Sequence, residues 1–123
     1  MTSPEQVLGS RIAVQPLADL EVTLPAGHSG VGSRHIVRDE PLLVFQDCVM
    51  HAGGSAERHR HESQDQILLV LAGTLELTIA DGEKVIASAD EIVRIPAGQP
   101  HSVLNSGEGD CRYLVLTYPT RSP

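Results

Sequence analysis

Three histidines in this chain are spaced so that they could bind one metal ion. His59 and His61 are separated by one residue, and His101 follows the segment Pro-Ala-Gly-Gln-Pro. Side chains alternate along a strand, so a His-x-His pair on a strand places both imidazoles on the same face. Neutral imidazole is a good ligand for zinc, copper, iron and nickel. The spacing therefore predicts one side of a metal centre, which His101 would complete from a distant strand.

The fourth ligand position is open to more than one residue. Gln66 begins the next predicted strand, and its carbonyl oxygen can ligate more weakly than a carboxylate. Asp65 and Glu62 are the competing acids, but both should face away from the histidines unless the strand bulges. A neutral amide leaves the metal more positive and should lower the pKa of a bound water further. We favour Gln66, which makes Lewis-acid chemistry a better match than chemistry that needs a carboxylate base at the metal.

Two further residues are candidates for substrate contact. Arg94 interrupts the apolar run Ile-Val-Arg-Ile, and it could reach an anionic substrate or point to solvent. Tyr113 lies on the last predicted strand, where its hydroxyl could enter a pocket or its ring could simply belong to the core. No catalytic residue can be named from the sequence.

The elements that must position these residues are short strands. Helical periodicity is nearly absent, and β-rich segments recur between turn residues, which predicts an all-β sandwich or barrel. Asp81-Gly82 is a dipeptide that type I′ hairpin turns favour. The run 67–71 is apolar on both faces, so a second sheet or a partner subunit should cover it. The predicted strands are residues 20–24, 33–38, 42–50, 66–71, 74–80, 84–88, 91–95, 101–105 and 111–118.

The bulk composition narrows the class of protein. The chain has 123 residues, a formal net charge of -7 and a pI near 5.2, so no basic stripe is available for nucleic acid. We expect Cys48 and Cys111 to be buried thiols rather than a disulfide, as in a reducing compartment. The N-terminal segment lacks the pattern of a signal peptide, and no apolar run is long enough to span a membrane. These features predict a cytoplasmic protein that acts on a small molecule.

The histidine-bearing segments resemble the two motifs of the cupin superfamily. Gly53-(x5)-His59-x-His61-(x4)-Gln66-(x6)-Gly73 resembles the first motif, with glutamine where glutamate is usual. Asp90-(x5)-Pro96-x-Gly98-(x2)-His101-(x3)-Asn105 resembles the second, with Asp90 in the place of its first glycine. The resemblance spans about residues 53–105 and implies a small jelly-roll β-barrel, a double-stranded β-helix. It also implies one divalent metal ion, which could be Fe, Mn, Ni, Zn or Cu, bound by His59, His61, Gln66 and His101.

The resemblance leaves the reaction open, because one fold can host many activities. We expect residues 20–118 to form the barrel, residues 1–19 an N-terminal arm or a late-pairing strand, and residues 119–123 a frayed tail. Our leading hypothesis is a metal-dependent isomerase, hydratase or lyase that acts on a small anionic or oxygenated substrate, such as a sugar acid or keto acid. The alternatives are an Fe(II)-dependent dioxygenase and a non-catalytic ligand-binding or metal-binding module. Resemblance to small cupins also predicts a homodimer.

Overall fold

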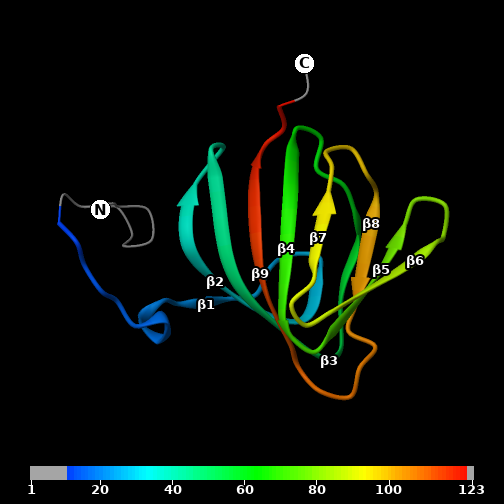
Figure 1. Cartoon of the computed structure of the whole chain (residues 1–123), viewed down its shortest axis with the longest axis horizontal. Helices are drawn as coiled ribbons and strands as arrows, with labels where there is room; N and C mark the ends of the chain where they lie inside the picture. Colours follow the sequence, from blue (N-terminus) through cyan, green and yellow to red (C-terminus); the bar gives the residue numbers. More distant parts are fainter. Residues whose placement is uncertain (1–10, 122–123) are drawn as a thin grey trace.

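Antiparallel strands wrap around a central space and form a barrel (Figure 1). The structure is a computed structural model that describes residues 11–121. Within that range the only helical element is the short 3-10 helix η2 (Leu17–Asp19). The strands are β1 (Val22–Thr23), β2 (His28–Asp39), β3 (Leu43–His59), β4 (Gln64–Ala72), β5 (Thr74–Ile79), β6 (Lys84–Ser88), β7 (Ile92–Ile95), β8 (His101–Leu104) and β9 (Cys111–Pro119). The predicted all-β jelly-roll barrel is confirmed.

The long strand β3 joins the two halves of the barrel. Its first half pairs with β9, where Met50 lies opposite Cys111, and its second half pairs with β8, where His59 lies opposite His101. The hydrogen-bonded order is β6-β5-β8-β3-β9-β4-β7, with β2 along the other edge of β3. A single strand, β3, therefore contributes side chains both to the part of the barrel that contains β9 and to the part that contains β8.

The apolar core lies inside the barrel, where inward-facing residues of neighbouring strands meet. Met50, Val70, Leu75 and Cys111 are almost completely buried. Burying side chains of this size stabilises the fold by about 1.5–3 kcal/mol each. The other members of this core are Val31, Cys48, Ala56, Leu68, Leu77, Ala87, Ile95, Val103, Tyr113 and Val115.

Residues 51–58 are strand, although the predicted strand 42–50 ends before them. Gly54 explains the difference, because a Cβ there would lie 2.8 Å from the carbonyl oxygen of His51 and 2.8 Å from Cγ of Met50. Glycine here allows a close approach within a bulged strand and does not interrupt it. The pairing of β2 with β3 shifts register in this region, between Ser29 and Val31.

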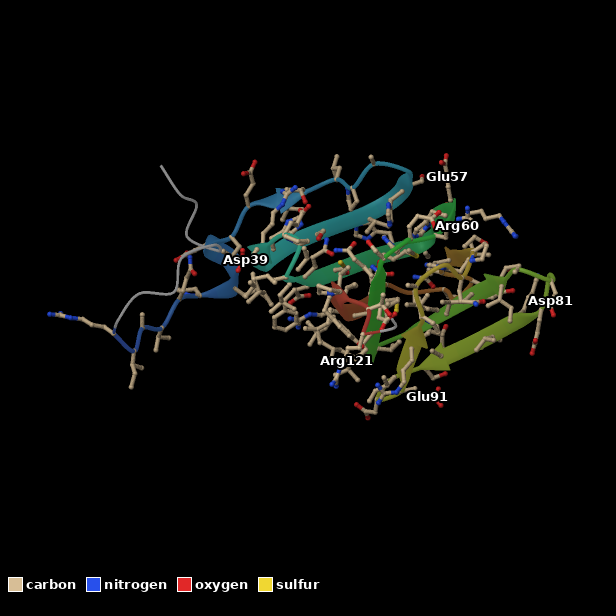
Figure 2. All side chains as sticks on the ribbon, turned by 90° about the horizontal axis from the view of Figure 1, so that it is seen from above. Asp39, Glu57, Arg60, Asp81, Glu91 and Arg121 are labelled. Carbon is tan, nitrogen blue, oxygen red and sulfur yellow. The ribbon has the colours of Figure 1, made fainter. Side chains whose placement is uncertain are left out.

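The β5–β6 hairpin forms at Asp81-Gly82, but the turn type differs from the prediction. A type I′ turn needs positive φ at both central residues. Among the described residues other than glycine, only Asp90 has a positive φ, so Asp81 does not meet this requirement. Gly82 has φ 88°, and its N–H donates to the carbonyl oxygen of Ile79. The loop is therefore a type I turn closed by a glycine in the left-handed region, which is the usual three-residue hairpin. Asp81 lies at its tip (Figure 2).

The chain ends differ partly from the expected boundaries. Residues 1–10 of the predicted arm lie outside the described residues, and residues 11–16 extend away from the barrel (Figure 1). At the other end, β9 continues to Pro119, and the N–H of Thr120 donates to the carbonyl oxygen of Ser63. Cys48 and Cys111 are both buried and both free, as predicted. Among the described residues there is no helix that could cross a membrane.

Candidate metal centre

His59 and His101 face each other across the β3–β8 pair, and their ring centroids are 4.4 Å apart. Each ring is oriented by a hydrogen bond to the backbone carbonyl oxygen two residues earlier. Nδ1 of His59 donates to the carbonyl oxygen of Glu57 at 2.6 Å, and Nδ1 of His101 donates to that of Gln99 at 2.8 Å. A proton on Nδ1 leaves the lone pair on Nε2, which is the arrangement found in metal-binding histidines. Both side chains are therefore prepared to ligate through Nε2.

His61 lies in the connection after β3, not on the strand with His59 as expected. The strand ends because the pairing with β8 stops at His59 and His101. The carbonyl oxygen of His61 accepts the N–H of Gly98 at 2.7 Å, which ties the two histidine-bearing segments together. Nε2 of His61 is buried and has no hydrogen-bond partner, and it is the only such side-chain atom in the described part of the chain. An unpartnered buried nitrogen is costly, and a metal ion would satisfy it.

The three rings converge but do not yet surround one point. The His59 and His61 centroids are 5.2 Å apart, and the His61 and His101 centroids are 6.3 Å apart. Neighbouring imidazoles on one metal have centroids roughly 4.6–5.3 Å apart, given metal–nitrogen bonds of about 2.1 Å, so the His61–His101 spacing is the one that is too long. Within residues 11–121, no three His, Cys, Asp or Glu side chains are already placed to hold a metal. The donor types and the unpartnered Nε2 of His61 nevertheless fit a metal ion.

Gln66 lies on β4 beside Thr117 and Ile95, and it contributes to the same cavity as the histidines. Its Nε2 donates to Oγ1 of Thr117 at 3.0 Å. The amide is therefore oriented with its nitrogen engaged, which leaves the carbonyl oxygen, the only atom of this side chain that can ligate, available.

The two competing acids have other structural roles. Oδ1 of Asp65 accepts the N–H of Ala97 at 2.9 Å, so this carboxylate supports the turn before His101. Glu62 is exposed and pairs with Nε of Arg60 at 2.7 Å. Neither residue lines the cavity that the histidines share. Of the three candidates for the fourth ligand, only Gln66 therefore lines the cavity that the histidines share.

The cavity inside the barrel has a volume of about 530 Å³, which is in the range of small-molecule sites. Its wall combines apolar residues such as Leu68 and Val115 with amide, hydroxyl and imidazole groups. Its charged lining residues include Glu57 and Arg60, which lie at one end of the molecule near the end of β3 (Figure 2). The arrangement offers a mainly neutral interior to a ligand that reaches the histidines.

Burial lowers the pKa of His61 and of His101 below the ordinary value. For His61 the neighbouring His59 and His101 lower it further, whereas the hydrogen bond to Gln99 partly offsets the effect on His101. Both rings are therefore neutral at neutral pH. Neutral imidazole is the form that binds a metal ion.

The two residues suggested for substrate contact are placed differently. Tyr113 is buried on β9 and lines the cavity beside Cys48. Burial raises the pKa of its hydroxyl, so the phenol stays protonated. Arg94 is exposed on β7, between the inward-facing Val93 and Ile95, and it does not line the cavity.

Several cavity residues had no signal in the motifs. Gln46, Gln64 and Thr117 line the cavity, as do His28 and His35 from β2. His28 is exposed, its ring centroid lies 6.2 Å from that of His59, and its Nδ1 donates to the carbonyl oxygen of Ala26. These residues line one cavity because of how the strands pair, and the strand pairing could not be determined from the sequence.

Comparison with known proteins gives one curated relative and many similar structures. The relative is quercetin 2,3-dioxygenase from Bacillus subtilis (strain 168), which is 39% identical over 86 residues, covering 60% of this chain and 25% of that protein. The chain thus spans about a quarter of its relative's length. A predicted oxalate decarboxylase from Thermotoga maritima has a TM-score of 0.78 at 22% identity, covering 88% of this chain and 100% of that one. The polyketide cyclase RemF from Streptomyces resistomycificus has a TM-score of 0.76 at 24% identity, covering 92% and 83% respectively.

These two structures have the same fold but different named activities, so the likeness shows the fold alone. The family follows from the sequence match. The model of the cupin domain matches residues 46–117, which include all three histidines and more than half of the chain. The chain therefore belongs to the cupin family.

Proposed function

We propose that this cupin binds one divalent metal ion through His59, His61, Gln66 and His101 and acts on a small oxygenated molecule in the barrel. The observation that carries this proposal is the buried Nε2 of His61, which has no protein partner and lies among two imidazoles with their Nδ1 atoms already engaged. A bound metal would supply Lewis acidity, which polarises a carbonyl or hydroxyl group.

The residues of the chain favour isomerisation, hydration or elimination. Asp65 and Glu62 are engaged elsewhere, so neither offers a carboxylate base next to Gln66. Tyr113 keeps its proton and can only donate a hydrogen bond or accept one. Apolar side chains such as Leu68 and Val115 would contact the carbon skeleton of a bound substrate. Isomerisation, hydration and elimination also need a proton to be moved, and a pocket side chain or a bound water would accept and return it.

A solvent-exchange experiment tests the reaction class. Metal-free protein would be loaded separately with Zn, Mn, Ni or Fe(II) and incubated in heavy water with a panel of keto acids and sugar acids. Proton NMR would then follow hydrogen exchange beside the carbonyl and the appearance of product. We expect exchange or turnover that needs the metal and disappears in His101→Ala. Metal binding without exchange or turnover of any compound would instead indicate a non-catalytic binding module.

Oxygen-dependent cleavage is a second candidate, because the curated relative is named quercetin 2,3-dioxygenase. Three histidine ligands with open positions suit Fe(II) enzymes that use oxygen. Oxygen uptake by the Fe(II)-loaded protein with quercetin, and none with quercetin omitted, would support this function. Absence of uptake with each of the four metals would count against it.

We also infer that the protein forms a homodimer through the outer face of β4, β7 and β9. Ile67 and Leu69 point outward there beside Leu114, and Ile92 is 55% exposed. A sheet face with apolar side chains in adjacent rows is typical of an interface. Ile92→Glu should convert a dimer to a monomer in sedimentation equilibrium without changing the circular dichroism spectrum. A natural chain that is already monomeric would contradict the inference.

A further inference from the structure

A second polar group lies on the wall of the cavity away from the histidines. Gln46, on the first half of β3, points inward opposite Val115 of β9 and His35 of β2, and all three line the cavity. Gln66 is two strands away, because β9 separates β3 from β4. Strands are about 4.8 Å apart, so the two glutamines are separated by roughly 10 Å across the wall.

The amide of Gln46 is held by a hydroxyl group that has no access to solvent. Nε2 of Gln46 donates to Oγ of Ser33 at 2.8 Å, and Sγ of Cys48 donates to the same oxygen at 3.6 Å. Ser33 is completely buried. Burial raises the pKa of Cys48 to about 11, so the thiol keeps the proton that it donates. This network fixes which end of the Gln46 amide faces the wall.

The carbonyl oxygen of Gln46 is therefore the end left for the cavity. No hydrogen bond to this oxygen is found among the described residues, and the Gln46 residue is only partly buried. An amide carbonyl can only accept hydrogen bonds. A ligand group that satisfies it must therefore bring a donor, such as a hydroxyl group.

We propose that Gln46 forms a hydroxyl-binding subsite, which would hold a hydroxylated substrate in the half of the cavity where β3 pairs with β9, whereas His59 and His101 lie where β3 pairs with β8. The proposal rests on the function inferred above and adds the substrate class. No arginine or lysine lines this part of the wall, where the charged lining residue is Glu40, and the arginines that line the cavity follow Glu57 at the end of β3. A molecule with an uncharged hydroxyl-bearing end fits this wall better than one with an anionic group at both ends.

Phenol and anisole are suitable probes, because they share a ring and differ in whether they can donate a hydrogen bond. Both would be titrated into metal-free, nitrogen-15-labelled protein, and binding would be followed by NMR at the backbone amides of residues that line the cavity, which every variant retains. Gln46→Met keeps the length of the side chain and removes its polar end. Gln64→Met is the matched control, since Gln64 also lines the cavity but lies on β4.

We expect phenol to bind about five-fold more tightly than anisole, the factor that one neutral hydrogen bond contributes. Gln46→Met should abolish this preference and Gln64→Met should retain it. Ser33→Ala, which frees the amide without changing residue 46, should reduce it. Equal binding of the two probes, no binding of phenol, or a preference that survives in Gln46→Met would overturn the proposal.

The metal does not enter this experiment, so the two proposals can fail separately. His61→Met should lose metal, measured by elemental analysis, and keep the preference for phenol. A natural chain that binds no metal but retains the preference would refute the proposed metal function and leave the subsite standing. A metal-binding chain without the preference would refute the subsite alone.

Discussion

Replacing His61 by methionine should stabilise the metal-free protein, although it should abolish metal binding. Nε2 of His61 is buried without a partner, and an unsatisfied buried polar atom costs about 1–3 kcal/mol. The side chain is only partly buried, so the lower end of that range applies. Methionine has a similar size, can adapt its shape and carries no strong polar atom. We therefore expect the free energy of unfolding to rise by about 1 kcal/mol.

His101→Met is the matched comparison and should have the opposite sign. Nδ1 of His101 donates to the carbonyl oxygen of Gln99 at 2.8 Å, and losing this bond costs about 1 kcal/mol. The two variants should therefore differ by about 2 kcal/mol, although both replace histidine by methionine.

Urea denaturation followed by circular dichroism, at pH 7.5 with a chelator present, measures this difference. Both rings are neutral at that pH, because burial lowers the pKa of each. The denaturant dependence of the free energy should not change, so the midpoints can be compared directly. The reasoning is refuted if His61→Met loses as much stability as His101→Met.

Three other predictions concern the site and the motifs. Gln66→Glu should bind a divalent metal at least about ten-fold more tightly in competition with a chelator, because a carboxylate is the stronger ligand; unchanged affinity would show that residue 66 does not ligate. Asp90→Gly should raise the free energy of unfolding by about 0.5–1 kcal/mol, because Asp90 has φ 70° where glycine is unstrained; a destabilised variant in urea denaturation would contradict this. The metal-free protein should lose stability as the pH falls below 6.5, the ordinary value for histidine. Just below pH 6.5 these two histidines bind protons in the unfolded chain but not in the folded protein, so the free energy of unfolding rises with pH. A free energy of unfolding that is constant between pH 5 and pH 7.5 would contradict this prediction.

Local patterns predicted most of the fold. The glycine and proline boundaries located most strands to within a few residues, but β2 begins five residues before its predicted start at 33 and β3 continues nine residues beyond its predicted end at 50. The sequence could not show that residues 51–58 continue β3, because the role of Gly54 depends on its contact with Met50 after folding. Asp81-Gly82 marked a hairpin, but the dipeptide alone did not determine which of the two residues would take a positive φ. Asp90 departs from the family glycine and still adopts the conformation that glycine favours.

The three histidines could be predicted as a group, whereas the strand positions and hydrogen bonds of the residues around the cavity could not. Motif spacing brought His59, His61 and His101 together without revealing that His61 lies beyond the strand. The hydrogen bond from Gln66 to Thr117 spans 51 residues of sequence, and that from Gln46 to Ser33 depends on the β2–β3 register. Arg94 was suggested by its charge in an apolar run, but strand alternation places it on the outer face.

Elemental analysis of metal per chain tests the central claim most directly. The natural protein, supplemented with a divalent metal and then freed of excess, should retain about one equivalent. His61→Met, which should fold at least as stably, should retain almost none. A natural chain that holds less than about a tenth of an equivalent, or a His61→Met variant that holds as much metal as the natural chain, would contradict the proposed metal centre.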